Sequence, residues 1–320
     1  MLRKIGRWAL RLVVGIAGLV LLLLLVVQMR WKRTFTVPYP AIQASTDPVV
    51  IEHGRRLFYG QAACAYCHVP RDGWARLDAG EMVPPSGAHR FPLPFGPVYS
   101  ANLTSDVATG IGGRTDAELA RTIRNGVRAN GRAIIPLMDY PGMSDDELVA
   151  VISYIRTLPP VVNQVPEHEL NMLGKALMAF AIGPQKAETP PPAVAPASAP
   201  TIERGKYLVL SNTLCADCHT KHSNEEKGKL AGGDPMEAAL DPKHLYVPPN
   251  LTPDPATGHI TGWTEETFLA RFRAGPVYKD GVMPWGAYGR MSDDDIRAIY
   301  RYLKSLPPIV NDTGPAVVDI

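Results

Sequence analysis

Cysteine is scarce in this chain of 320 residues, which contains only four. All four lie in two copies of a Cys-x-x-Cys-His pentapeptide, Cys64–His68 and Cys215–His219. No fifth cysteine remains to ligate an iron or to resolve a disulfide. A zinc site would have to join two pairs that are far apart in the sequence, and it would leave both histidines unexplained. A thioredoxin-like dithiol needs a βαβ context, which neither pair has.

The spacing of the pentapeptide is instead that of covalent c-type haem attachment. Two thiols three residues apart can each form a thioether to one porphyrin, and the next residue places an imidazole under the iron. The sequence therefore predicts two covalently bound haem c groups, which carry single electrons. The expected attachment residues are Cys64, Cys67, Cys215 and Cys218, and the expected histidine ligands are His68 and His219.

Acidic residues are absent before Asp47, and the segment from Leu12 to Met29 contains no charged side chain at all. Trp8 and Trp31 bracket this apolar segment at a separation that a helix covers in about 35 Å, enough for a bilayer core and its interfaces. The segment is longer than the ~7–15 residue core of a signal peptide, and no small-residue cleavage pattern follows it. We expect residues 1–33 to form an uncleaved transmembrane anchor.

The distribution of charge bears on orientation and on partners. Basic residues flank the apolar segment on both sides, so the positive-inside rule gives little direction. Covalent haem is attached on the outer side of a bacterial inner membrane, which predicts a single-pass protein with its bulk in the periplasm. Seven of the 33 basic residues precede residue 34, which leaves 26 against 31 acidic ones in the body. This net charge of −5 and the lack of a basic stripe exclude nucleic acid and favour a redox partner with a positive patch.

Strand patterns are also rare, and the chain repeats one helical plan. Gly54 precedes Cys64 by ten residues, and Gly205 precedes Cys215 by the same distance. Further paired segments are Asn102-Leu103-Thr104 with Asn250-Leu251-Thr252, and Met143-Ser144-Asp145-Asp146 with Met291-Ser292-Asp293-Asp294. We therefore expect an all-α fold of two tandem domains, residues 47–165 and 201–312.

The closing helix of each predicted domain has recognisable ends. Ser144 with Glu147 has the pattern of a capping box, and a Pro-Pro pair stops each helix. Residues 166–200 between the domains hold an apolar segment and a Pro/Ala-rich linker, which reads as semi-extended. The apolar part, Leu170–Ile182, is expected to be a helix packing on the first domain, with a place at the membrane surface as the alternative.

The sixth iron ligand is expected to be methionine, which electron carriers commonly use. Met283 lies in a Met-Pro loop before the second closing helix. Its counterpart at equal spacing in the first repeat is Ile135, which cannot ligate. Met138, three residues further on, is the predicted ligand there, and Met143 is the alternative.

Together, the Cys-x-x-Cys-His, Asn-Leu-Thr, Met-Pro and Ser-Asp-Asp…Leu-Pro-Pro segments resemble class I cytochromes c, over roughly residues 48–165 and 201–312. The tandem arrangement is similar to the cytochrome c subunits of membrane-bound alcohol and sugar dehydrogenases. The resemblance implies axial roles for Met138 and Met283 and a relay of electrons from a dehydrogenase or quinol oxidoreductase to a terminal acceptor. Two departures stand out: those subunits typically carry three haem modules, and Asp139 lies where Met-Pro is expected.

Two other functions remain open at the level of sequence. In a peroxidase-like dihaem enzyme, the first iron would be open or unusually ligated, as Ile135 at the expected ligand position would allow. The chain could also be a sensor or structural subunit of a larger respiratory assembly. An electron carrier or electron-transfer subunit is preferred to a stand-alone enzyme, because both irons have candidate ligands on both sides.

Overall fold

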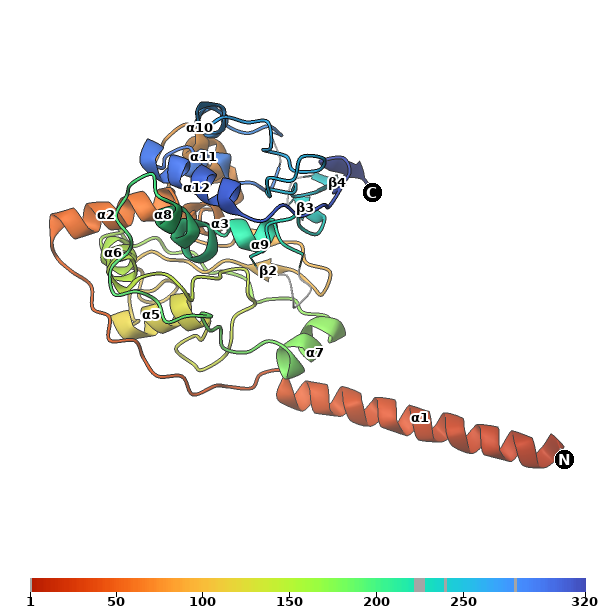
Figure 1. The fold of residues 1–320 in the computed structure, drawn as a ribbon. Coiled ribbons are helices and arrows are strands. Elements are labelled where there is room, and N and C mark those ends of the chain that lie inside the picture. Colours follow the sequence, from red (N-terminus) through yellow and green to blue (C-terminus); the bar gives the residue numbers. More distant parts are fainter. Residues whose placement is uncertain (1, 222–227, 239–240, 279–280) are drawn as a thin grey trace.

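A computed structural model describes residues 2–221, 228–238, 241–278 and 281–320. A long helix, α1 (Leu2–Arg30), projects from a body in which the two repeats lie against each other (Figure 1). The first repeat contains α2 (Pro48–Tyr59), α3 (Cys64–His68), a 3-10 turn at Arg71–Gly73, α4 (Trp74–Asp78), α5 (Asp116–Asn125) and α6 (Asp145–Arg156). The second contains α8 (Ile202–Tyr207), a π turn at Leu208–Asn212, α9 (Cys215–Cys218), α10 (Glu265–Arg273), α11 (Trp285–Tyr288) and α12 (Asp293–Ser305). Between them lies α7 (Met172–Phe180), the helix expected in the apolar segment.

Short strands complete the described part of the chain, so the all-α expectation was incomplete. The two hairpin strands β1 (Arg90–Phe91) and β2 (Val98–Tyr99) are antiparallel. A second antiparallel sheet joins β3 (Met236–Ala238), β4 (Asp241–Tyr246) and β5 (Val317–Asp319). Strands β1, β2, β3 and β5 have only two or three residues, too few to reveal an alternating pattern, and the longer β4 begins Asp-Pro-Lys-His, which does not alternate polar with apolar residues.

Each repeat is closed by a crossing of its first and last helices, α2 with α6 and α8 with α12. A Cβ added to Gly54 would lie 1.8 Å from the carbonyl oxygen of Ala150, and one added to Gly205 would lie 1.9 Å from that of Ala298. Real side chains do not tolerate such distances. The two glycines therefore permit the helix backbones to touch, and this explains why both repeats place glycine ten residues before the first cysteine.

The two repeats share one hydrophobic core. A single cluster of buried side chains includes Phe58 and Ile152 from the first repeat and Leu208 and Ile299 from the second. Burial of such apolar surface is the main favourable contribution to folding, at roughly 25 cal/mol per Å². The contact between repeats is therefore part of the core of the molecule.

The Pro/Ala-rich segment is held along the ends of the closing helices. The amides of Asp145 and Asp146 donate to the carbonyls of Pro192 and Ala193, at 3.0 and 3.1 Å. The Ser198 hydroxyl donates to Asp295 at 3.1 Å, at the start of α12. Residues 184–200 form neither helix nor strand, and their bonds fasten the start of α6 to the start of α12.

Helix α1 differs from the others in its surface. Residues Arg7–Arg30 are long and apolar enough to cross a membrane, and 6% of the most apolar window is buried. Its leucines and valines face outward for most of its length.

Candidate haem sites

The two cysteine pairs lie at corresponding places in the repeats, on α3 and α9. The residue before each pair has a left-handed backbone, with φ of 48° at Ala63 and 56° at Leu214. This conformation turns the chain sharply into the short helix that carries the thiols. None of the four cysteines forms a disulfide.

The four thiols lack the properties of nucleophiles or of zinc ligands. Burial raises the pKa of Cys64 and Cys218 to about 12 and that of Cys67 and Cys215 to about 11. Reactive cysteines have lowered pKa values. No group of three His, Cys, Asp or Glu that could hold a metal ion occurs among the described residues. Raised pKa values and the lack of such a cluster argue against a thiolate nucleophile and against a zinc site at either pair.

Both histidines are oriented by a backbone carbonyl. Nδ1 of His68 lies 2.8 Å from the carbonyl oxygen of Ala101, and Nδ1 of His219 lies 3.0 Å from that of Pro249. Burial lowers the pKa of both imidazoles, that of His219 to about 4, so both are neutral near pH 7. A neutral ring that donates from Nδ1 has an unprotonated Nε2, which is the form that binds a metal.

The Asn-Leu-Thr segments hold these carbonyls in place. Nδ2 of Asn102 donates to the carbonyl of Val161 at 2.8 Å, and Nδ2 of Asn250 donates to that of Ile309 at 2.8 Å. Each asparagine also accepts the amide of the threonine two residues later, at 3.0 Å. The carbonyl that binds each histidine belongs to the residue directly before the asparagine, Ala101 or Pro249. The sequence revealed this repeated segment, but its role in orienting the histidines is visible only in the structure.

The first site opens on a cavity of about 680 Å³. Cys64, Cys67, His68 and Met138 all line it, so the residues predicted to hold the first haem are brought together. The rest of its wall is largely apolar and includes Ile135. Cofactor sites commonly have volumes of about 300–1,000 Å³ and apolar walls with a few polar groups. The residues present therefore fit a large, mainly apolar group attached at α3.

Both candidate methionines of the first repeat line this cavity. Met138 is half-buried, and its carbonyl accepts a hydrogen bond of 2.7 Å from Gln185. Met143 is fully buried, and its carbonyl accepts from Arg124 at 2.7 Å. Its counterpart Met291 has an equivalent bond of 2.8 Å from Arg273. Met143 thus occupies a packing position that both repeats share.

Met283 lies just before α11, in a loop whose preceding residues 279–280 are outside the described ranges. It is half-buried and packs against the shared core, as does Cys215. Trp285 and Tyr288 of α11 cover the same region, with Trp285 at 5.5 Å from the ring of Phe272. The role of Met283 as the axial methionine of the second site stays a prediction.

Two buried tyrosines that the sequence pattern does not single out lie beside the attachment sites. The Tyr140 hydroxyl donates to the carbonyl of Ala62 at 2.5 Å, and the Tyr288 hydroxyl donates to that of Thr213. Each acceptor lies two residues before the first cysteine of its pair. Burial first, and then the nearby Cys64 and Cys67 thiols and the Tyr288 hydroxyl, raise the pKa of Tyr140 well above its usual value.

The attachment sites are close to each other. Leu214, the residue before Cys215, lines the cavity of the first site. The pKa of Cys218 is raised by burial and further by neighbouring charges that include Cys67 of the other pair. The repeats thus turn their cysteine-bearing helices toward a common junction.

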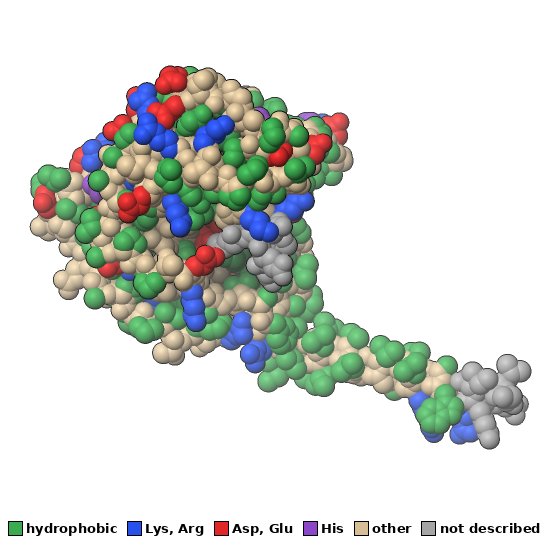
Figure 2. Space-filling view, viewed as in Figure 1, with side chains coloured by type: hydrophobic (Ala, Val, Ile, Leu, Met, Phe, Trp, Pro, Cys, Tyr) green, Lys and Arg blue, Asp and Glu red, His purple; other side chains and the backbone are tan. Residues whose placement is uncertain are grey.

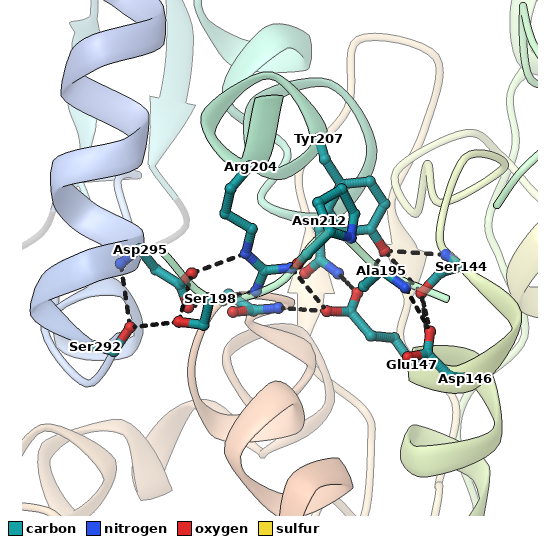
Figure 3. A network of polar contacts seen from close by, with 12 residues as sticks. Ser144, Asp146, Glu147, Ala195, Ser198, Arg204, Tyr207, Asn212, Ser292 and Asp295 are labelled. Atoms are coloured by element: carbon teal, nitrogen blue, oxygen red, sulfur yellow. Dashed lines mark hydrogen bonds and ion pairs between the residues drawn. The ribbon is translucent and has the colours of Figure 1, made fainter. Parts of the chain in front are cut away.

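A buried ionic network joins the two repeats (Figure 3). Nε of Arg204, at the start of the second repeat, lies 2.8 Å from Oδ1 of Asp295, and its Nη1 lies 3.4 Å from Oε1 of Glu147 in the first repeat. Glu147 also accepts from Tyr207 at 2.5 Å and from Asn212. Burial raises the pKa of Glu147, while Tyr207 and Arg204 act to lower it.

This network corrects the expected capping box at Ser144. Ser144 does accept the amide of Glu147, at 3.4 Å. The Glu147 carboxylate, however, is engaged by the second repeat, and the Ser144 amide donates to the Tyr207 hydroxyl at 3.0 Å instead. A reciprocal capping box forms at Thr115 and Glu118, at an exposed helix end.

Comparison with known proteins agrees with this geometry. Residues 200–303 match the family model of cytochrome c oxidase, cbb3-type, subunit III, so a cytochrome c domain is present. The chain is 30% identical over 278 residues to the cytochrome c subunit of a quinone alcohol dehydrogenase from Gluconacetobacter polyoxogenes, covering 80% of this chain and 56% of that protein. It is 29% identical over 261 residues to the gluconate 2-dehydrogenase cytochrome c subunit of Pantoea cypripedii, covering 76% and 56%.

A further relative is closer in length. A diheme cytochrome c-type protein of Cereibacter sphaeroides is 29% identical over 268 residues, covering 80% of this chain and 86% of the relative. The chain spans about half the length of the dehydrogenase subunits it matches. The resemblance to cytochrome c subunits of alcohol and sugar dehydrogenases, predicted from the sequence, is confirmed.

Proposed function

We propose that this chain is a membrane-tethered dihaem cytochrome c, with its bulk in the periplasm, that relays single electrons. The observation that carries the proposal is the duplicated site: each cysteine pair has the same left-handed entry, the same carbonyl-bound histidine and the same asparagine support. A single copy could arise from packing alone. The full set of contacts, formed twice, is expected of two sites with one chemistry.

Specific residues would hold each haem. Cys64 and Cys67 would be bonded to the first and Cys215 and Cys218 to the second, and the histidine of each pentapeptide would ligate the iron. We propose Met138 and Met283 as the opposite ligands. Such a group, when bound, supplies one-electron redox chemistry, and methionine ligation raises its potential.

The shared junction supports transfer within the molecule. The buried Tyr140 and Tyr288 each bond to the chain just before one cysteine-bearing helix, Cys67 lies near Cys218, and one hydrophobic core contains both tyrosines. The Arg204 network and the fastened linker hold the two repeats in one arrangement. We therefore propose a fixed separation between the haems rather than one set by a loose tether.

The partner is proposed to be a membrane-bound or periplasmic oxidoreductase. The relatives are named as subunits of alcohol, gluconate and fructose dehydrogenases, which suggests a dehydrogenase as donor. The net charge of −5 on the body would steer a partner with a positive patch. A membrane tether would raise the effective concentration of such partners.

The relay is tested by rapid mixing of the fully reduced full-length protein with an excess of a basic, soluble c-type cytochrome as acceptor. Two electrons should leave each chain. A Cys215→Ser/Cys218→Ser variant, with only the first haem attached, should release one. Delivery of one electron by the wild-type protein would contradict the proposal.

A peroxidase-like enzyme is the second candidate, because Ile135 lines the first cavity and occupies the position that corresponds to Met283 in the second repeat. The same reduced protein distinguishes the two functions. A carrier with both axial positions filled should consume no hydrogen peroxide, whereas an open first iron should turn it over.

A further inference from the structure

Helix α7 leaves an apolar stripe uncovered beside the end of α1. Leu173 and Phe180 are two helical turns apart, and they are 56% and 50% exposed. The opposite face of the helix, with Gly174, Met178 and Ala179, is buried against the first repeat. An amphipathic helix normally buries its apolar face and exposes a polar one, so an exposed apolar stripe needs an occupant.

The end of α1 is bonded directly to the end of α7. Nε of Arg30 donates to the carbonyl of Ala179 at 3.1 Å, and Nη2 of Arg33 donates to that of Ile182 at 2.9 Å. The guanidinium of Arg30 also lies 5.9 Å from the ring centre of Phe180. Figure 1 shows α7 at the foot of α1, and hydrophobic side chains gather around this point in Figure 2.

These bonds set the depth of α7 if α1 crosses the membrane. The 24 residues Arg7–Arg30 would extend about 36 Å as a helix, slightly more than the roughly 30 Å hydrocarbon core. Arg30 and Trp31 would then lie at the level of the headgroups, where tryptophan and arginine are favoured. The end of α7 is fastened to the same level.

The charges around the stripe match a phospholipid surface. Cations surround the Trp31 ring: Lys32 at 4.9 Å, Arg132 at 5.2 Å and Lys175 at 5.4 Å from its centre. No acidic residue occurs from Leu170 to Ile182. Apolar side chains flanked by cations are the pattern of helices that lie in the plane of a membrane interface.

We propose that α7 is an interfacial helix whose Leu173 and Phe180 enter the outer leaflet of the bilayer. This inference rests on the proposed membrane anchoring by α1. Contact of α7 with the bilayer would fix the tilt of the body. A body attached by one spanning helix alone can swing, whereas a second point of contact prevents this. The cavity of the first haem site, which Trp31 and Lys32 also line, would then face the membrane.

The test uses the full-length haem-loaded protein in bilayer nanodiscs of phosphatidylcholine and phosphatidylglycerol. Because all four native cysteines would be bonded to haem, a single introduced cysteine can carry a fluorophore. The labelled variants are Leu173→Cys and Phe180→Cys, with Leu19→Cys in α1 as the bilayer reference. Val49→Cys at the start of α2, which is 74% exposed and far from α1 in Figure 1, is the aqueous reference.

Labels at 173 and 180 should be quenched several-fold more strongly by nitroxide-labelled lipids than the label at 49, and less strongly by aqueous iodide. If both behave like the label at 49 while the label at 19 is quenched by lipid, the inference is wrong and the anchor stands. If neither quencher reaches them, another protein surface covers α7, and the inference is also wrong. If the label at 19 is itself reached only by iodide, both the anchor and the inference fail.

Discussion

Single residues decide how each histidine is presented. His68 and His219 have the same partner, a carbonyl held by Asn102 or Asn250, although the two repeats otherwise differ in sequence. Each asparagine also bonds to the chain just after the closing helix, at Val161 or Ile309. These bonds connect the proposed haem site to the closing helix. A residue that appears in the sequence only as part of a repeat is thus a structural support for the histidine that is the proposed ligand.

Met138→Ala should open the first iron. We expect loss of the methionine–iron charge-transfer band of one haem and binding of carbon monoxide to its reduced form, because alanine offers no sulfur ligand. Optical spectra of the purified protein measure both effects.

Met143→Ala is the matched control, since both methionines line the same cavity. It should keep the band and lower the free energy of unfolding by about 2–5 kcal/mol, as truncation of a buried methionine does. The reverse pattern, with the band lost only in Met143→Ala, would assign the ligand to Met143.

Arg204→Met should destabilise the fold strongly. It would leave the buried carboxylates of Glu147 and Asp295 without their cation, at a cost of about 3–5 kcal/mol. Arg76→Met, which removes a solvent-exposed ion pair with Glu81, is the control and should leave the free energy of unfolding nearly unchanged. Chemical denaturation at neutral pH measures both.

The loss in Arg204→Met should depend on pH. Burial raises the pKa of Glu147 above its ordinary 4.5, because the folded protein disfavours the charged carboxylate. Arg204 lowers this pKa, because its positive charge stabilises the carboxylate. In Arg204→Met the pKa of Glu147 is higher still. The loss of stability relative to the wild type is complete at pH values above that pKa. The deficit should shrink as the pH falls through the raised pKa toward 4.5. A deficit that stays constant over this range would show that the Glu147 charge is not its source.

At the scale of elements, the closing helices are the parts that the sequence predicted best, whereas the contact that Gly54 and Gly205 allow between helices is visible only in the structure. The paired glycines, the closing helices and the Pro-Pro stops were all visible, because they are local patterns with strong physical causes. The Glu147 carboxylate was misjudged because its partners, Arg204, Tyr207 and Asn212, come from the other repeat. Local sequence gives no sign of such competition.

Gly54→Ala and Gly205→Ala test the crossings. Each added methyl would meet a helix carbonyl at under 2 Å, so the helices must separate, and we expect losses of at least about 1–3 kcal/mol. Gly262→Ala has no atom within 4 Å of the new Cβ and should leave stability nearly unchanged. Thermal unfolding of the three variants measures the difference. Equal melting temperatures for all three would contradict the crossing as described.

At the scale of the whole molecule, the sequence predicted the two repeats but not their common core. Phe58 and Ile299 are apolar positions of helices in either case, and nothing in their spacing indicates that one cluster contains both. The linker was likewise seen as extended, while its bonds to Asp145 and Asp146 follow from the packing of the repeats. Most of the described strands have two or three residues, too few for periodicity, and the six residues of β4 do not alternate polar with apolar side chains. The junction between attachment sites is therefore knowledge that only the structure supplies.

The proposed two-haem relay is tested most directly by a potentiometric titration of the full-length protein, followed by optical and electron paramagnetic resonance spectra. Two one-electron steps per chain are expected, both from low-spin iron, with no change in either step under carbon monoxide. A single haem per chain, or a high-spin haem whose reduced form binds carbon monoxide, would contradict it.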